Sequence, residues 1–368
     1  MEQHVLDLVR GMIAEGHEIH VWCPEGKPFE YYKDAGAIVT AKKISSDFDR
    51  FYIQDLSSYL GDNKIDVIHA HELKAAANAL LAAKNAGTPA KITHVHTPIS
   101  EWKIGSVRKK IDILFYSYIV NRMSDAEIAL TESKKQAKIG EGIKKDKIVV
   151  IPNGLDVEKL TVTPTERINY NEEMRKRYNI GKNAFIFGNV GRISREKGHD
   201  VLINAFRKFL STDMYHNKDF ALVIAGGGEL EEEIKLLAQT KGVSERVVFT
   251  GEFPPEDLVK IYSLFDLFLF PTLAEGFGLV LIEAMYSGLP VICSDLEVLK
   301  EVADDTVTYF RTGDFIDLAE KMIESYDIHT TSGKPENLKG KERVIENYTL
   351  KAFINNYVSL YERFLNTR

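Results

Sequence analysis

The densest set of residues that could do chemistry lies between Glu275 and Glu283, in the run AEGFGLVLIEAM. The pattern predicts a strand, a turn at Gly276 and Gly278, and then a helix. The first amides of a helix lack partners and carry partial positive charge, so a phosphate can dock there. Glu275 would lie beside it, and Glu283, about two turns further, would reach another part of one extended ligand. The ordinary alternative is a dipole partner at Glu275 and a solvated helix residue at Glu283.

A cluster of cations follows the expected strand FIFGNV, in the segment GRISREKG. Arginine can hold phosphate oxygens through two parallel bonds, and lysine acts as a mobile point charge. Arg192 with Lys197 therefore suits a diphosphate, including charge that builds up on a departing one. Arg195 is expected to face solvent. The alternative for this segment is a surface ion network with Glu196 and nearby acids.

Four histidines follow two expected strands in the first half of the chain: His69 and His71 in DVIHAHE, and His94 and His96 in ITHVHTP. Residues two apart on a strand share a face, so a metal site built from all four is one interpretation. Structural zinc usually recruits cysteine, and both cysteines fall in other segments. We therefore expect no metal, and a polar lining with His96 nearest the ligand. A satisfied structural role is the ordinary alternative for each histidine.

These residues must be positioned by a larger α/β framework. Short apolar runs alternate with amphipathic helices along the chain. The polar, turn-rich residues 161–183 interrupt this alternation, which continues after them. The pattern predicts two doubly wound, Rossmann-like domains over residues 1–158 and 159–345, and a C-terminal helix over 346–368 that packs back toward the first domain. Such sheets bind ligands beyond the carboxyl ends of their strands, so we expect the chemistry in a cleft between the domains.

Composition excludes several classes of function. The 368 residues are 44% hydrophobic and 27% charged, as in ordinary soluble proteins, and the net charge of −7 disfavours nucleic acid as a partner. Two cysteines are too few for a disulfide framework. With no apparent membrane span or secretory signal, a cytoplasmic protein is expected. The basic runs KIGSVRKK and SKKQAKIGEGIKKDK suggest peripheral contact with an anionic inner membrane face, or else a solvated surface.

Taken together, these segments resemble the family-4 retaining glycosyltransferases of the GT-B architecture over nearly the whole chain. Glu275 and Glu283 match that family's E-x7-E motif. The segment from Gly191 to Gly198 matches its G-R-x-x-x-x-K-G phosphate loop, and IPNGLD at 151–156 looks like the turn that closes the first domain.

The resemblance implies a role for each matched residue. Arg192 and Lys197 would hold the donor diphosphate, Glu275 the sugar and phosphate, and Glu283 the ribose. His96, in HTP, matches a histidine near the transferred sugar, and the segment TGEF corresponds to the lining of the base. The implied catalytic residues are His96, Arg192, Lys197 and Glu275. The implied donor-binding residues are Gly191, Arg192, Lys197, Gly251, Phe253, Glu275, Gly276, Phe277, Gly278, Leu279 and Glu283.

The implied function is transfer of a hexose from a UDP- or GDP-sugar to a hydroxyl acceptor, with retention at the anomeric carbon. The acceptor would be a sugar, a lipid-linked compound or a small molecule, in glycolipid or surface polysaccharide synthesis. No acidic D-x-D motif occurs in a plausible donor loop, so neither a metal nor a cofactor is expected. Two alternatives remain: a nucleotide-sugar epimerase or hydrolase of the same architecture, and a non-catalytic subunit that binds sugar nucleotides.

The start of the chain departs from the family pattern. The family begins with a strand and a G-G-x-E loop before its first helix, whereas here Met1-Glu2-Gln3-His4 leads directly into a helix and only the Glu of that loop is present. In a doubly wound sheet the first strand is central. We therefore expect the natural reading frame to extend about 15 to 25 residues upstream, or the chain as given to be impaired.

Overall fold

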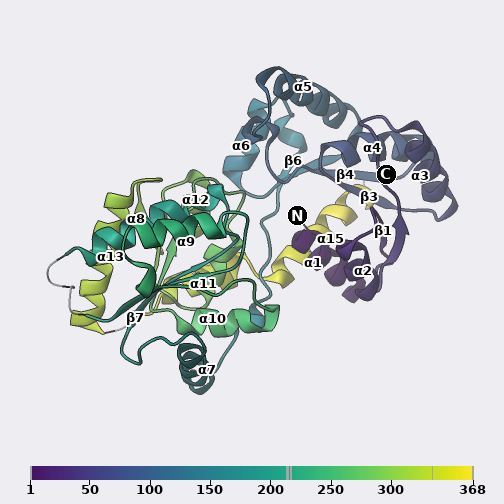
Figure 1. The fold of residues 1–368 in the computed structure, drawn as a ribbon. Helices are drawn as coiled ribbons and strands as arrows, with labels where there is room; N and C mark the ends of the chain where they lie inside the picture. Colours follow the sequence, from purple (N-terminus) through teal and green to yellow (C-terminus); the bar gives the residue numbers. More distant parts are fainter. Residues whose placement is uncertain (1, 213–214, 216–217, 334, 367–368) are drawn as a thin grey trace. The chain divides into compact units, whose positions relative to one another are not determined.

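The computed structural model describes residues 2–212, 215, 218–333 and 335–366, and the chain divides into two compact units (Figure 1). Unit 1 comprises Met1–Gly154 with Leu350–Arg368, and unit 2 comprises Leu155–Thr349. The sequence placed the boundary near residue 158. It falls earlier because the amide of Leu155 donates to the carbonyl of Tyr348 at 2.7 Å and Leu155 bridges Thr349, which ties this residue to unit 2.

Unit 1 contains two parallel sheets, of four strands in the order β3-β4-β5-β6 and of two strands, β1 and β2. Its strands are β1 (His20–Cys23), β2 (Ile38–Ala41), β3 (Val67–His71), β4 (Ala90–His94), β5 (Ala126–Ala129) and β6 (Ile148–Val150). The expected additional strand concerns residues upstream of this chain and stays an expectation.

Helices of unit 1 cover both faces of the larger sheet. They are α1 (Glu2–Ala14), α2 (Lys27–Asp34), α3 (Arg50–Asp62), α4 (Leu73–Ala86), α5 (Ser106–Met123), α6 (Glu132–Gly140) and α15 (Leu350–Asn366). Helices α3, α4 and α5 share one apolar core, around Leu80 and Val120. Helices α1 and α15 share another with Ile92 and Ile128 of the sheet, and Figure 1 shows them side by side. The end of the chain therefore packs within unit 1.

Unit 2 contains a six-stranded parallel sheet in the order β12-β11-β10-β7-β8-β9. Its strands are β7 (Phe185–Val190), β8 (Phe220–Ala225), β9 (Val247–Phe249), β10 (Leu267–Phe270), β11 (Val291–Ser294) and β12 (Thr308–Phe310). The chain winds outward from β7 to β9, then crosses back and starts again at β10 on the other side of β7. The order of the strands therefore reverses between β7 and β10, the point at which doubly wound sheets bind ligands.

The helices of unit 2 are α7 (Pro164–Arg177), α8 (His199–Leu210), α9 (Glu231–Thr240), α10 (Leu258–Leu264), α11 (Leu279–Tyr286), α12 (Glu297–Ala303), α13 (Phe315–Ser332) and α14 (Leu338–Asn347). Helices α8, α9 and α13 enclose one core with Phe187 and Leu222 of the sheet. Elsewhere in the unit, α11 packs against α12 and α14, and α10 against α7.

Helix α7 corrects the sequence analysis, which expected residues 161–183 to be a turn-rich segment. The hydroxyl of Thr163 accepts from the amide of Glu166 at 3.2 Å, and the Glu166 carboxylate accepts from the amide of Thr163 at 2.8 Å. Pro164 occupies the first helical position. The sequence TPTE at 163–166 is a recognisable motif for this reciprocal capping. The helix was missed because it carries few apolar residues, and Met174 is the one it buries.

Both cysteines lie in strands, and both are free thiols. Cys293 is buried in β11 and Cys23 is half-buried in β1, and this burial raises the pKa of each thiol. Among the described residues, no helix combines the length and the apolar character that a membrane crossing requires.

Candidate functional site

The carboxyl ends of β7 and β10 bring together two loops that the sequence had singled out. One runs from Gly191 to Gly198 after β7, and the other from Pro271 to Gly278 after β10. The amide of Leu273 donates to the carbonyl of Glu196 at 2.7 Å, and the hydroxyl of Thr272 donates to the same carbonyl at 3.0 Å. These bonds fix the loops to each other at the point where the strand order reverses. Thr272 was not among the residues nominated from the sequence.

Lys197 and Glu275 form an ion pair between these two loops. The ammonium Nζ of Lys197 lies 2.7 Å from Oε2 of Glu275, and the two side chains are 23% and 15% exposed. The other carboxylate oxygen, Oε1, accepts from the amide of Gly276 at 3.0 Å. Because both side chains are largely withdrawn from water, their attraction is stronger than that of a surface pair. Two of the four residues nominated for catalysis are thus in direct contact.

Glycines allow the two loops to take these paths. Gly198 has a φ of +66°, and a Cβ there would collide with the carbonyl oxygen of Pro271. Gly278, with a φ of +98°, is the residue before α11. A Cβ built at Gly276 would meet nothing within 4 Å, so the backbone is open there. Both left-handed positions would be strained with any other residue.

Phe277 and Leu279 contribute differently to the start of α11. The Phe277 ring is buried and packs edge-on against Tyr348, with centroids 5.5 Å apart. Only its backbone is therefore available to a ligand. Leu279 is the first residue of α11 and is half-buried, and the first amides of a helix have no partner within it. The arrangement offers an anion backbone N–H groups beside the Lys197 ammonium.

Arg192 has a different partner from Lys197. Its guanidinium Nη2 lies 3.0 Å from Oε2 of Glu229, at the turn after β8, and the Arg192 side chain is 71% exposed. This matches the surface ion network that was the alternative for this segment. Exposed pairs of this kind contribute little to stability, about 0 to 1 kcal/mol. If the anion of a ligand replaced Glu229 as the partner of Arg192, the free energy of unfolding would therefore change little.

Glu283 is held by a residue that sequence reasoning missed. The hydroxyl of Tyr262, in α10, donates to Oε2 of Glu283 at 2.7 Å. Burial raises the pKa of the Glu283 carboxyl, and this hydrogen bond opposes the rise. The alternative of a solvated helix residue is therefore wrong, because Glu283 is only partly exposed and has a protein partner. The sequence held no signal for Tyr262, since the contact arises from the packing of α10 near α11.

Gly251 and Phe253 lie in the loop after β9. Gly251 forms an isolated bridge with Gly226, the residue after β8, and the amide of Gly226 donates to the hydroxyl of Thr250 at 3.3 Å. Phe253 is half-buried. The nominated residues of unit 2 therefore follow the carboxyl ends of three strands of one sheet, β7, β9 and β10.

Unit 1 contains four histidines, His4, His71, His94 and His96, and one ring nitrogen from each lies within 4.8 Å of the corresponding nitrogens of the other three. His4 takes the place that the sequence analysis gave to His69, because Nδ1 of His69 is 2.7 Å from the hydroxyl of Tyr361. Nδ1 of His71 lies 3.2 Å from Nε2 of His96, and the rings of His94 and His96 are stacked with centroids 3.8 Å apart. We name these four residues the histidine cluster.

Burial keeps the histidine cluster neutral. It lowers the pKa of His4 to about 4, and it lowers the pKa values of His71, His94 and His96, with the neighbouring imidazoles adding to the effect. Nδ1 of His4 lies 2.7 Å from the side-chain oxygen of Asn153. Neither ring nitrogen of His94 has a hydrogen-bond partner within the described chain. Neutral imidazoles can line a polar site or ligate a metal, so the cluster is compatible with both.

Acidic residues beside the histidine cluster were also missed from the sequence. Glu72 directly follows β3 and has a φ of +71°, a strained conformation for a residue other than glycine. Its Oε1 accepts from the amide of His96 at 3.3 Å, and burial raises the pKa of its carboxyl. Glu127, in β5, is fully buried and pairs with Lys138, and it accepts from the hydroxyl of Tyr116 at 2.7 Å. Glu127 also accepts from the amide of Val95 at 3.2 Å, so both carboxylates bond to the backbone beside His94 and His96.

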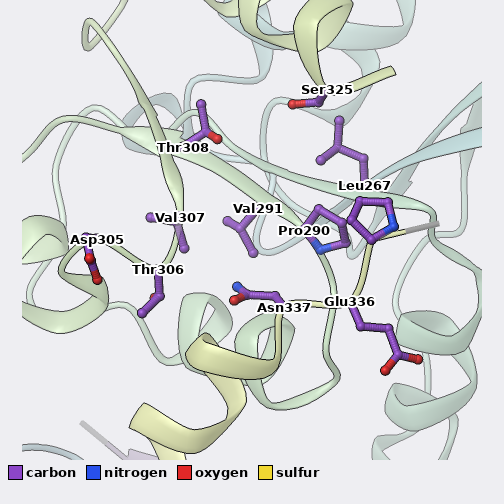
Figure 2. Close-up of a pocket in the computed structure, with 11 residues that line it drawn as sticks. Leu267, Pro290, Val291, Asp305, Thr306, Val307, Thr308, Ser325, Glu336 and Asn337 are labelled. Carbon is purple, nitrogen blue, oxygen red and sulfur yellow. The ribbon is translucent and has the colours of Figure 1, made fainter. Parts of the chain in front are cut away.

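A cavity of about 270 Å³ lies elsewhere in unit 2 (Figure 2). Its lining includes the first residues of β10, β11 and β12, namely Leu267, Val291 and Thr308, together with the acidic residues Asp305 and Glu336. It therefore opens at the amino ends of the strands, opposite to the loops above. None of the nominated residues lines it, and neither does any lysine or arginine. This chemistry does not suit a diphosphate.

Two families of known proteins match the two units separately. The family described as Glycosyltransferase Family 4 matches residues 1–159, and the family described as Glycosyl transferases group 1 matches residues 171–340. Among curated relatives, an uncharacterized 41.2 kDa protein in the cps region of Klebsiella pneumoniae is 28% identical, with 98% of this chain and 99% of that protein covered. The UDP-Gal:alpha-D-GlcNAc-diphosphoundecaprenol alpha-1,3-galactosyltransferase of Escherichia coli is 29% identical over 77% of this chain and 72% of its own length.

Solved structures with the same fold cover almost the whole chain. A glycosyltransferase from Rickettsia africae superposes with a TM-score of 0.85 at 19% identity, covering 100% of this chain and 95% of that one. Anabaena Alr3699/HepE, crystallised in complex with UDP-glucose, gives a TM-score of 0.81 at 17% identity, with 98% and 95% covered. The expectation of two doubly wound α/β domains is confirmed by these likenesses and by the three parallel sheets, two in unit 1 and one in unit 2.

Proposed function

Because this chain is a family-4-like glycosyltransferase of the GT-B fold, we propose that it transfers a hexose from a UDP- or GDP-sugar to a hydroxyl acceptor with retention at the anomeric carbon. The observation that carries the proposal is the Lys197–Glu275 pair at the carboxyl ends of β7 and β10. It places a cation, a carboxylate and the open start of α11 together, which suits a diphosphate joined to a sugar. A UDP-sugar donor is supported by the name of the Escherichia coli relative and by the Anabaena complex.

The nominated side chains and loops of unit 2 have proposed roles. Lys197 and Arg192 neutralise the diphosphate, and Arg192 exchanges its exposed contact with Glu229 for phosphate oxygens. Glu275 and the amides from Gly276 to Leu279 bind the sugar and the phosphate. Glu283 accepts hydrogen bonds from ribose hydroxyls, and the loop holding Gly251 and Phe253 lines the base.

The proposed reaction needs no metal and no cofactor. The acceptor oxygen forms a bond to the anomeric carbon as the bond from that carbon to the diphosphate oxygen breaks. The acceptor attacks the face from which the diphosphate leaves, and its proton passes to the departing oxygen. The positive charges of Lys197 and Arg192 stabilise the negative charge that develops there. The role of His96 beside the transferred sugar is a further proposal from the family resemblance.

The acceptor is proposed to be lipid-linked, in glycolipid or surface polysaccharide synthesis on the cytoplasmic side of a membrane. Unit 1 is proposed to bind it. The support is the Escherichia coli relative, whose name gives a diphosphoundecaprenol acceptor. The neutral histidine cluster suits this role, since uncharged imidazoles can exchange hydrogen bonds with sugar hydroxyls.

A donor panel tests the proposed function. UDP-, GDP- and ADP-sugars are incubated with lipid-linked and soluble acceptors, and mass spectrometry detects both products. Release of nucleoside diphosphate that depends on an acceptor supports a transferase, and NMR of the new linkage tests retention. Free or epimerised sugar formed without an acceptor would instead identify a hydrolase or epimerase. Donor binding without turnover would identify a binding subunit.

Metal independence gives a separate prediction. We expect turnover to survive EDTA with less than a twofold change, because Lys197 and Arg192 supply the charge that a metal would otherwise supply. The measurement compares rates with excess EDTA and with added Mg²⁺ or Zn²⁺. Complete loss with EDTA that zinc restores would assign the histidine cluster to a metal and contradict the proposal.

Glu283→Gln is expected to weaken nucleotide binding roughly 10- to 100-fold, the usual range for loss of a charged hydrogen bond, with a smaller effect on kcat. Isothermal titration with UDP or GDP measures it. Tyr262→Phe is the matched variant, because it removes the 2.7 Å bond to Glu283 and keeps the carboxylate. It should weaken binding less. Equal nucleotide affinity of the wild type and Glu283→Gln would contradict the proposal that Glu283 binds the ribose.

A further inference from the structure

Helix α5 exposes a row of large apolar side chains in unit 1. Val107, Ile111, Leu114 and Tyr118 are each between 60% and 72% exposed. Their spacings of four, three and four residues place them on one face of the helix, over a length of roughly 17 Å. The opposite face is already used, since Tyr116 and Val120 are buried in the core with α4. We name the exposed residues the α5 stripe.

The α5 stripe has no match elsewhere in the described chain. Exposed large apolar side chains occur on other helices, but no other described helix carries four of them on one face. Single exposed apolar residues are normal on protein surfaces, whereas contiguous groups mark interaction sites. Phe48 extends the group, because its exposed ring packs edge-on against Phe115 of α5 with centroids 5.2 Å apart.

Positive charges flank the α5 stripe on both sides. Helix α5 carries four basic residues and one acidic residue, a net charge of +3 in a chain whose net charge is −7. Lys110 lies beside the stripe on one side, and Arg108 and Arg122 on the other. Asp112, the one carboxylate, is largely buried and lies 3.5 Å from Arg108. The accessible charge that α5 itself places around the stripe is therefore positive, whereas Phe48 stands between two partly exposed carboxylates, Asp47 and Asp49.

Helix stability does not explain these cations. Three of the four, Arg108, Lys109 and Lys110, lie near the amino end of α5, where the helix dipole disfavours positive charge. The first turn has no acidic residue, and Gly105 before it provides no side-chain cap. Arg108 lies 3.5 Å from Asp112, and Nζ of Lys109 donates to the carbonyl of Ser100 at 2.9 Å. Among the described residues Lys110 has no such partner, so its position near the start of α5 brings no structural gain and points to a function.

We propose that the α5 stripe docks unit 1 onto a bilayer surface that carries anionic lipid headgroups. The apolar side chains would enter the interface, and the flanking cations would reach the phosphates, as in interfacial amphipathic helices. A second copy of the chain is the less favourable occupant. If two α5 helices paired along the stripe, Arg108, Lys110 and Arg122 would occupy the flanking positions and bring like charges together.

The location of the stripe suits the proposed acceptor. Helix α5 begins ten residues after His96, and the indole of Trp102 between them donates to the carbonyl of Thr97 at 2.9 Å. The docking helix and the histidine cluster are thus joined by a short, anchored segment. The idea that docking brings the acceptor to the histidine cluster rests on the proposed function. The docking itself does not, because vesicle binding needs neither donor nor acceptor.

Vesicle sedimentation tests the proposal. The wild-type chain should sediment with vesicles of phosphatidylcholine containing 30 mol% phosphatidylglycerol, and less with phosphatidylcholine alone or at high salt. Leu114→Glu and the double variant Arg108→Gln/Lys110→Gln should each lower the partition coefficient roughly tenfold or more. Leu236→Glu, at a residue that is 62% exposed on α9 of unit 2, is the matched control and should bind like wild type.

Three results would overturn the docking surface. They are no binding of wild type to anionic vesicles, equal binding of Leu114→Glu, and a wild-type dimer that Leu114→Glu converts to monomer. Thermal unfolding and donor turnover with a soluble acceptor are measured on the same samples. Loss of vesicle binding with turnover intact isolates the docking surface, whereas absent turnover in a wild type that still binds vesicles counts against the proposed function alone.

Discussion

Replacing Lys197 by alanine is expected to lower kcat/KM roughly 30- to 800-fold, the equivalent of about 2 to 4 kcal/mol of transition-state stabilisation. Its ammonium lies 2.7 Å from Glu275, in the loop that leads to α11, where the departing diphosphate is proposed to lie. Arg192→Ala should act in the same direction. Steady-state kinetics with the best donor of the panel measure both.

A matched variant separates catalysis from stability. Lys260 is also in unit 2, is 26% exposed compared with 23% for Lys197, and is likewise paired with carboxylates, of Glu173 and Asp257. Lys260→Ala should therefore perturb the fold about as much and leave turnover within about threefold of wild type. Wild-type kinetics in a folded Lys197→Ala/Arg192→Ala protein would refute the diphosphate assignment.

The contact between Lys197 and Glu275 predicts that variants of the two residues have coupled effects on turnover. Glu275→Gln should also lower turnover strongly while the fold stays intact. Because the two side chains touch, the effects of the single variants should not add. We expect the double variant to lose less than the sum of the single losses. Additive losses would mean that the two residues act independently on the donor.

Acidification from pH 7.5 to pH 5.5 is expected to lower the free energy of unfolding of unit 1 by more than about 1 kcal/mol, the contribution of His4 alone. Burial lowers the pKa values of His4, His69, His71, His94 and His96, that of His4 to about 4. In the unfolded chain each would have a pKa near 6.5. As pH falls through 6.5, these histidines bind protons in the unfolded state but not in the folded state. The free energy of unfolding therefore decreases. One such group contributes about 1.4 kcal/mol at pH 5.5.

Tryptophan fluorescence can follow this loss in unit 1 alone. The chain has two tryptophans, Trp22 and Trp102, and both belong to unit 1. Urea unfolding detected by their emission at the two pH values gives the change in free energy of unfolding. His94→Gln should reduce that change by about 1 kcal/mol, whereas His17→Gln, at an exposed histidine, should not alter it. A pH-independent midpoint would show that these imidazoles are not held neutral.

Local patterns in the sequence were enough to predict the fold class and the segments that could form the site. Alternation of apolar runs with helical periodicity follows from strand and helix geometry, so it predicts a parallel α/β chain from local patterns. The segment around Glu275, Gly278 and Glu283 predicts a strand, a turn and a helix in that order, as the structure has them. Local turn chemistry also marked α7, through Thr163 and Glu166, although we had expected no helix there.

Contacts between these residues depend on how the chain folds in three dimensions, which the local patterns did not predict. Lys197 and Glu275 are 78 positions apart, and they touch because the chain crosses back to place β10 beside β7. Tyr262 reaches Glu283, and His4 rather than His69 joins the histidine cluster, through helix packing that no local pattern encodes. Pattern and turn chemistry act over a few residues, whereas pairing between side chains depends on the order in which a sheet is wound and on what then packs against it.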